Sequence, residues 1–152
     1  MDKKKILHVN AIKDGTVIDH IPAEHLFTVI KVLGLDHIDK PITFGTNMES
    51  KKLGHKGLIK LWDVFLEEKD LNRIALITET AGINVIRDYK VVEKKQVTAP
   101  DKIYGLATCV NPKCITNHEK IPTRFTVVNK GEISLKCDYC EKITEKSNFK
   151  IH

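Results

Sequence analysis

Four cysteine residues are the clearest chemical signal in this sequence of 152 residues. They form two close pairs, Cys109-x4-Cys114 and Cys137-x2-Cys140, which are separated by 22 residues. Two such turns bring four sulfur atoms onto one tetrahedral ion, and thiolates in that geometry select zinc or iron. Because four protein ligands leave no position for water, the spacing predicts one structural zinc ion per chain.

Two other interpretations of the cysteines remain open. They could be four unrelated buried thiols, or Cys137 and Cys140 could form a redox pair. A redox pair usually opens a helix after a strand, whereas this pair lies among short predicted strands. The first 108 residues contain no cysteine, while a disulfide scaffold would spread more cysteines through a shorter chain. A metal site is the interpretation that these observations favour.

Polar residues that interrupt apolar strands are a weaker signal. Asp19-His20 and Lys60 lie between aliphatic residues, where they either reach a ligand at the sheet or are ordinary exposed side chains. The sequence has no Gly-rich phosphate loop, no Ser/His/Asp set and no paired carboxylates, so a catalytic role has no support. Weaker candidates on the last predicted strand are Asn84, Tyr89 and Lys94.

The elements that must position these residues follow the order β-α-β-β-α-β. Apolar periodicity, Pro22 and Gly34 predict a helix between them, after an extended segment over 6–21 with a turn at 13–15. Strands are predicted over 41–48, 58–65 and 83–92, a turn over 50–57 and a second helix over 68–76. This order predicts an α+β fold, a ferredoxin-like antiparallel sheet with two helices on one face.

A polar, proline-containing join over 94–101 predicts two domains, 1–98 and 99–152. The second domain is expected to be a small all-β, zinc-ribbon-like unit with strands over 103–108, 124–129, 133–136 and 142–146. A segment of about fifty residues buries too little apolar surface to fold alone, so we expect it to need the metal.

Charge and hydropathy narrow the classes of partner. No apolar run approaches the ~20 residues of a membrane span, and no apolar region follows the basic N-terminus, so we expect a cytoplasmic protein without a membrane partner. Residues 99–152 contribute +3 of the net charge of +5, and zinc with four thiolates would remove two of those charges. That is little for a nucleic-acid site, although a nucleic-acid-binding zinc ribbon remains the alternative.

Five segments of the chain occur in an order that is typical of one family. They are residues 9–23, 57–60, 84–94, 109–115 and 135–141. Together they resemble the regulatory chain of aspartate carbamoyltransferase over nearly the whole length. The resemblance implies a non-catalytic, allosteric subunit of de novo pyrimidine biosynthesis. It also implies a homodimer of regulatory chains, a zinc domain that contacts the catalytic chain, and CTP and ATP as effectors.

The resemblance also implies an effector site. The backbone at Ala11, Ile12 and Tyr89 would meet the base, and Asp19, Lys60 and Asn84 would lie near the sugar and the base. His20 and Lys94 would lie near the phosphates. The side chains of Val9, Ile86 and Val91 would line the pocket. Two positions depart from the family, since Gly57 and Trp62 stand where acidic residues are usual. Both changes remove negative charge near Lys60, which leaves the strength and sign of the effector response open.

Overall fold

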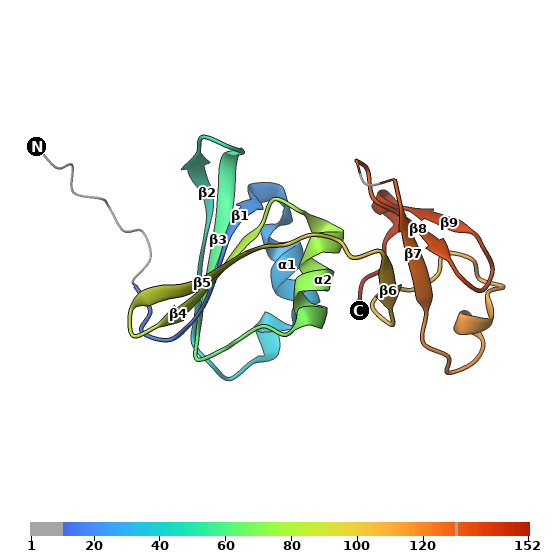
Figure 1. The fold of residues 1–152 in the computed structure, drawn as a ribbon, viewed down its shortest axis with the longest axis horizontal. Coiled ribbons are helices and arrows are strands. Elements are labelled where there is room, and N and C mark those ends of the chain that lie inside the picture. The colour runs from blue at the N-terminus through green and yellow to red at the C-terminus, as the bar shows by residue number, and fades with distance from the viewer. Residues whose placement is uncertain (1–10, 130) are drawn as a thin grey trace, which may run out of the picture.

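Two antiparallel sheets make up the protein (Figure 1). The computed structural model describes residues 11–129 and 131–152. The first sheet has five strands in the order β2-β3-β1-β4-β5, and the second has four in the order β6-β7-β8-β9. Each sheet has its own cluster of buried apolar side chains. The predicted pairing of an α+β unit with a smaller all-β unit is confirmed.

The first sheet consists of β1 (Gly15–Pro22), β2 (Ile42–Ser50), β3 (Gly54–Trp62), β4 (Gly82–Arg87) and β5 (Lys90–Gln96). Helices α1 (Leu26–Val32) and α2 (Glu68–Ile77) cover one face of it (Figure 1). Strand residues alternate between the two faces, so Ile18, Ile59 and Ile83 reach the core under the helices. Among the described residues, no helix lies on the opposite face.

Local signals explain both helices. At α2, the Asp70 carboxylate accepts a bond from Glu67 N at 3.0 Å and the Glu67 side chain accepts one from Asp70 N, a capping box that starts the helix. A 3-10 turn, η1 (Ala23–His25), leads into α1, and Gly34 follows it with φ 66°, a left-handed conformation that glycine adopts freely. The predicted helices are confirmed to within a few residues.

The prediction of one strand over 83–92 is wrong. Asp88 and Tyr89 have φ angles of 51° and 64°, which makes a two-residue turn between β4 and β5. The turn lacks the usual Asn-Gly signal; instead Asp14 Oδ1 accepts from Asp88 N at 3.1 Å and Lys13 O accepts from Tyr89 N at 2.9 Å.

Because β5 continues to Gln96, the join between the sheets starts later than predicted. The turn over 50–57 is also shorter, since β3 begins at Gly54.

The second sheet consists of β6 (Lys102–Tyr104), β7 (Arg124–Val128), β8 (Ser134–Cys137) and β9 (Ile143–Glu145). Phe125, Ile103 and Leu135 form its core together with the cysteines. The short turns η3 (Ile115–Asn117) and η4 (Lys146–Asn148) lie outside the sheet, as η2 (Leu35–His37) does in the first part of the chain. The four predicted strands are confirmed, although β6 is shorter because Gly105 turns the chain with φ 66°.

The second sheet packs against the helix layer of the first part. Leu76 of α2 belongs to the second apolar cluster, and Ile151 packs against both clusters. Arg73 Nε on α2 donates to His152 O at 3.0 Å. The two cores are therefore joined through α2. No helix of the described residues is long and apolar enough to cross a membrane.

Candidate metal centre and ligand-binding sheet face

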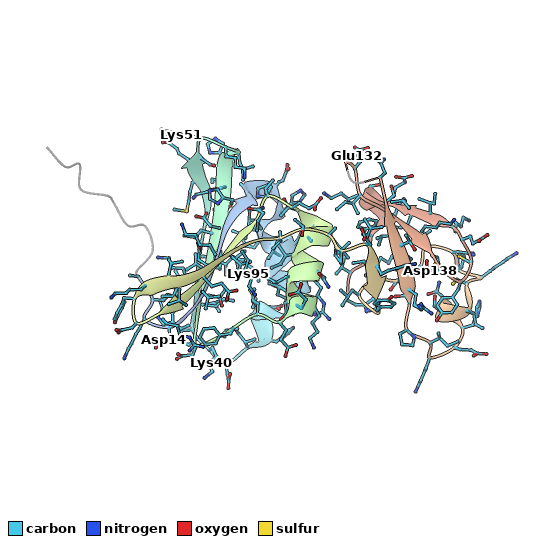
Figure 2. The ribbon with its side chains drawn as sticks, viewed as in Figure 1. Asp14, Lys40, Lys51, Lys95, Glu132 and Asp138 are labelled. Carbon is cyan, nitrogen blue, oxygen red and sulfur yellow. The ribbon has the colours of Figure 1, made fainter. Side chains whose placement is uncertain are left out.

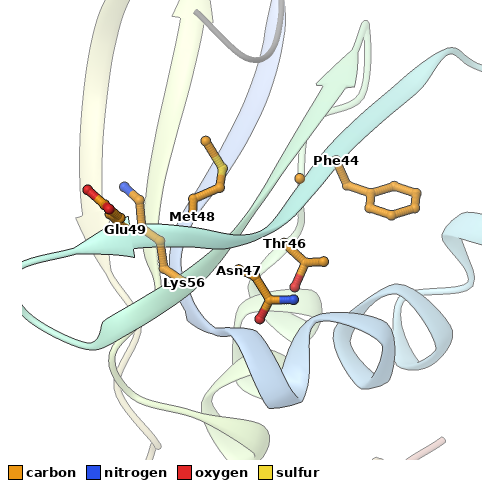
Figure 3. A pocket seen from close by; sticks show the side chains of 7 residues that line it. Phe44, Thr46, Asn47, Met48, Glu49 and Lys56 are labelled. Carbon is orange, nitrogen blue, oxygen red and sulfur yellow. The ribbon is translucent and has the colours of Figure 1, made fainter. Parts of the chain in front are cut away.

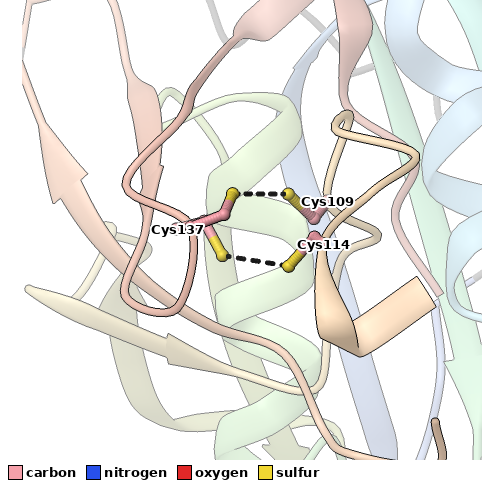
Figure 4. Close-up of side chains that lie close together, drawn as sticks. Cys109, Cys114 and Cys137 are labelled. Carbon is pink, nitrogen blue, oxygen red and sulfur yellow. Dashed lines mark hydrogen bonds between the residues drawn. The ribbon is translucent and has the colours of Figure 1, made fainter. Parts of the chain in front are cut away.

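The four cysteine side chains converge on one point (Figure 4). Their sulfur atoms all lie within 4.8 Å of one another, with Cys109 and Cys140 Sγ 3.6 Å apart and Cys114 and Cys137 Sγ 3.7 Å apart. These distances exclude disulfides, which need about 2.05 Å. Sulfur atoms around a tetrahedral zinc with Zn–S bonds of about 2.3 Å lie about 3.8 Å apart. The donor set and its spacing therefore fit a structural zinc ion.

Burial opposes ionisation of these thiols, so a bound cation would be needed to hold all four as thiolates. Burial raises the pKa of the Cys109 thiol to about 12, and it also raises the pKa of Cys137. At Cys140, burial acts in the same direction, but hydrogen bonds from Asn111 and from the Lys142 backbone outweigh it and lower the pKa to about 7. Four thiolates in this space would repel one another, and a divalent cation offsets that repulsion.

The loop that carries Cys109 and Cys114 is held by Asn117. The Asn117 amide donates to Cys109 O at 3.0 Å and to Asn111 O at 2.7 Å. Cys114 N also donates to Asn111 O, at 3.0 Å. The Thr116 hydroxyl lies 3.2 Å from Cys114 Sγ. Asn117 was not predicted from the sequence, since nothing in its spacing distinguishes it from a surface residue.

Asp138, which is labelled in Figure 2, holds the turn that carries Cys137 and Cys140. One Asp138 carboxylate oxygen accepts from Thr126 Oγ1 at 2.7 Å, and the other accepts from Lys102 Nζ at 3.1 Å. These bonds, with that from Thr126 first, lower the pKa of Asp138. They tie the turn to β6 and β7. Asp138 was also missed, although it lies inside the Cys-x-x-Cys motif.

Three predicted effector residues form one row across the first sheet. Lys60 on β3 pairs with Val17 on β1, Val17 pairs with Asn84 on β4, and Asn84 pairs with Lys94 on β5. Directly paired residues project from the same face of a sheet. Because the neighbouring Ile59 and Ile83 reach the core, the row lies on the face without helices. We call this the outer face. The sheet thus aligns Lys60, Asn84 and Lys94.

Asp19 and His20 lie where β1 becomes irregular between Ile18 and Ile21. His20 has φ 58°, and its carbonyl accepts from the Thr80 hydroxyl at 2.8 Å. Asp19 Oδ1 lies 2.8 Å from Lys56 Nζ, a residue that was not predicted. Burial lowers the pKa of Lys60, and the charge of Asp19 opposes that shift. Asp19, Lys56 and Lys60 therefore form one electrostatically coupled group at the edge of the row.

The other predicted residues that the structure describes lie around the end of the outer face where β1 starts. Ile86 pairs with Gly15 and with Val91, and Ile12 is buried outside the main core cluster. Tyr89 lies in the β4–β5 turn, and its N–H already donates to Lys13 O, so only its carbonyl is left for a base. Ala11, which precedes Ile12 in the chain, is exposed. Val9 lies outside the described residues.

A concave surface lies along the edge strand β2 (Figure 3). This cavity of about 740 Å³ is lined by Phe44, Gly45, Thr46, Asn47, Met48, Glu49 and Lys56. Register shifts between β2 and β3 at Gly45 and Met48, and Asn47 with φ 57°, curve the strand there. None of the predicted site residues that the structure describes lines this cavity, and the sequence did not indicate it.

Comparison with known proteins agrees with this division into a sheet with helices and a cysteine site. A family model described as "Aspartate carbamoyltransferase regulatory chain, allosteric domain" matches residues 7–98, and one described as "Aspartate carbamoyltransferase regulatory chain, metal binding domain" matches residues 101–150. The chain is 49% identical over 150 residues to an aspartate carbamoyltransferase regulatory chain of Bacteroides thetaiotaomicron, covering 99% of this chain and 98% of that one. It is 53% identical over 140 residues to the regulatory chain of Porphyromonas gingivalis, covering 92% of this chain and 93% of that one. It is 46% identical over 145 residues to the regulatory chain of Pyrococcus horikoshii, covering 94% of this chain and 95% of that one.

Proposed function

Because the chain belongs to the family of aspartate carbamoyltransferase regulatory chains, we propose that it binds CTP and ATP on the outer face of its first sheet. Members of this family are non-catalytic subunits with an allosteric domain and a metal-binding domain, which assigns the chain to the regulation of pyrimidine biosynthesis. The observation that supports the effector site is the row Lys60–Asn84–Lys94, which lies beside Asp19 and His20.

The chemistry of this row suits a nucleoside triphosphate. Lys60 and Lys94 are three strand spacings apart, about 14 Å, so they meet different parts of an extended ligand. Lys94 and His20 would donate to phosphates, and Asp19 would accept from ribose hydroxyls. Lys60 and Asn84 would lie beside the sugar and base, with Ile86 and Val91 as the apolar wall. The carbonyl of Tyr89 would accept from an amino group of the base.

The two domains would have different roles. Residues 1–98 would bind the effector and form the homodimer, and residues 99–152 would contact the catalytic chain. Support comes from the separate core of each sheet and from the join that follows β5. One zinc ion, held by Cys109, Cys114, Cys137 and Cys140, would keep the second domain folded. An effector would then shift the assembly between two states, a coupling typically worth ~1–3 kcal/mol.

The edge strand β2 is the face that we assign to the homodimer. Strand β5, at the other edge, carries Lys90, Lys94 and Lys95, and charges of this kind oppose pairing with another chain. Strand β2 has no lysine, and Phe44 exposes 43% of its surface there while its ring contacts that of Phe27 at 5.7 Å. An edge that carries one charge, Glu49, and exposes aromatic rings suits a second copy.

The surface around the cysteines is the face that we assign to the catalytic chain. It exposes the apolar side chains of Val110, Ile115, Tyr139 and Ile143. The expected assembly is two catalytic trimers joined by three regulatory dimers, in the cytoplasm.

Affinity purification from the native cell tests this assignment, since a carbamoyltransferase catalytic chain should copurify. Calorimetric titration of the chain with CTP and ATP tests the effector site, and absence of binding to both would contradict it.

A further inference from the structure

The outer face carries a second row of side chains next to the lysines. Trp62 pairs with Gly15, Gly15 pairs with Ile86, and Ile86 pairs with Val91. Leu61 is fully buried in the core, so Trp62 projects from the opposite face, as Lys60 does. The indole is partly exposed, and it is the single tryptophan of the chain. An aromatic side chain therefore belongs to the outer face.

Gly15 leaves the middle of this row without a side chain. A Cβ atom at this position would overlap the carbonyl oxygen of Leu61, so the position requires glycine. Gly15 and Ile86 are themselves buried, so the partly exposed indole of Trp62 is the part of this row that a ligand can reach. An indole ring next to buried aliphatic and glycine residues suits a planar ring rather than a charged group.

The apolar row and the lysine row are close enough to serve one ligand. Residues two apart along a strand are separated by about 7 Å, so Trp62 lies next to Lys60 and Gly15 lies next to Val17. The apolar row also lies at the end of the sheet where Ile12 and the Tyr89 turn are found. A base at this end would leave the sugar and phosphates over Lys60, Asn84 and Lys94.

We infer that Trp62 stacks on the base of the effector and that it favours adenine over cytosine. This inference rests on the proposed effector site. Base–aromatic stacking works for every base, and it strengthens with the area of ring overlap, so a two-ring purine gains more from the indole than a pyrimidine does. Trp62 then adds a recognition surface to the proposed effector site.

Tryptophan emission gives a direct test with the full-length chain. Because there is one tryptophan, any change in emission on titration reports this position. ATP should quench the emission strongly, CTP less, and inorganic tripolyphosphate little, since it has no ring to stack. Emission that stays constant while calorimetry registers ATP binding would overturn the inference and leave the effector site standing.

Variants separate stacking from a merely structural role of the side chain. Trp62→Leu should weaken ATP binding about tenfold, and Trp62→Phe, which keeps a ring, should stay within about threefold of the wild type. CTP should lose less than ATP in Trp62→Leu, and tripolyphosphate should bind all three proteins alike. Tyr104→Leu, which removes an exposed ring from the second sheet, serves as the matched control and should leave ATP binding unchanged.

Each outcome of these measurements either supports or overturns the inference about Trp62. Equal weakening of ATP, CTP and tripolyphosphate in Trp62→Leu would show that Trp62 only supports the sheet, and this would overturn the inference. Wild-type ATP affinity in Trp62→Leu would overturn it as well. A wild-type chain that binds neither nucleotide nor tripolyphosphate would overturn the inference together with the proposed effector site.

Discussion

At the scale of single residues, side chains that do not ligate the metal hold the cysteine loops in position. Asn117 closes the first loop through two carbonyl groups, and Asp138 ties the second to neighbouring strands through Thr126 and Lys102. Residues that orient ligands in this way commonly affect metal affinity without touching the ion.

Replacing Asn117 by alanine should weaken zinc binding by about 10–100-fold, the usual effect of losing an outer hydrogen-bonding partner of a metal site. Competition with a chromophoric chelator measures this. Lys120→Ala, at an exposed position shortly after Asn117, is the control and should bind zinc like the wild type. Equal zinc affinity of Asn117→Ala and the control would show that the Asn117 bonds do not support the site.

Thr144 has a buried hydroxyl for which the described residues offer no hydrogen-bond partner. Such a group costs about 1–3 kcal/mol, so Thr144→Val, which keeps the shape, should raise the free energy of unfolding by about that amount. Denaturant unfolding of the zinc-loaded chain measures the change. Thr126→Val should act in the opposite direction, because its hydroxyl donates to Asp138. A lower stability of Thr144→Val would mean that the hydroxyl has a partner in solution.

At the scale of elements, α1 lies unusually close to β3 at Gly57. A Cβ atom there would lie 2.8 Å from Leu26 Cδ1 and 3.0 Å from Leu26 Cβ. Gly57 makes room for a fully buried leucine. The packing of a helix on a strand therefore accounts for the glycine at this position.

Gly57→Ala should lower the free energy of unfolding by about 1–3 kcal/mol through overpacking. In a Leu26→Ala background the same change should cost much less, because the colliding side chain has been removed. Equilibrium unfolding of the two single variants and the double variant gives the coupling energy. If the two costs simply add, the close approach of residues 26 and 57 does not limit this site.

The lysine row is also an arrangement of elements, since its members come from three strands. Lys94→Ala should weaken CTP and ATP about equally, because it would meet phosphates that both nucleotides share. Lys60→Ala should change the preference between them, because its proposed place is beside sugar and base. Each charge-assisted contact is worth about 1.5–3 kcal/mol.

Calorimetric titration of both lysine variants measures these effects. Lys95→Ala is the matched control, because Lys95 pairs with Ile83 and so projects from the face opposite to Lys94. Wild-type affinity for both nucleotides in Lys60→Ala and Lys94→Ala would place the effector elsewhere on the chain.

At the scale of the whole molecule, the two sheets depend on different sources of stability. The first has an extensive apolar core under two helices, while the core of the second includes Cys109, Cys114 and Cys137 themselves. A small sheet built around its metal ligands needs the ion to remain folded.

Removing the metal with a chelator should therefore unfold the second sheet and leave the first one folded. Limited proteolysis should cleave within 99–152 only, and Cys114→Ala should behave in the same way without chelator. Docking on the catalytic chain, measured by light scattering, should be lost. Nucleotide binding should persist. Normal docking of Cys114→Ala would show that the metal does not organise the contact surface.

The sequence by itself determined the features that depend on neighbouring residues. The two cysteine pairs predicted one metal site because short turns place their ligands locally, and periodicity with caps predicted both helices to within a few residues. The order of elements indicated the kind of sheet, and ordered motifs indicated the family. Where a local signal was missing, as at Asp88 and Tyr89, the prediction was wrong.

The tertiary structure alone decided which distant residues meet. Lys60, Asn84 and Lys94 share a row because each strand sets its register by burying its apolar face under the helices, and a slip of one residue would turn every side chain to the other face. The same registers place Trp62 beside Gly15 and bring Lys56 to Asp19. Registers of this kind depend on packing among segments far apart in the chain, so no local pattern in the sequence could reveal them.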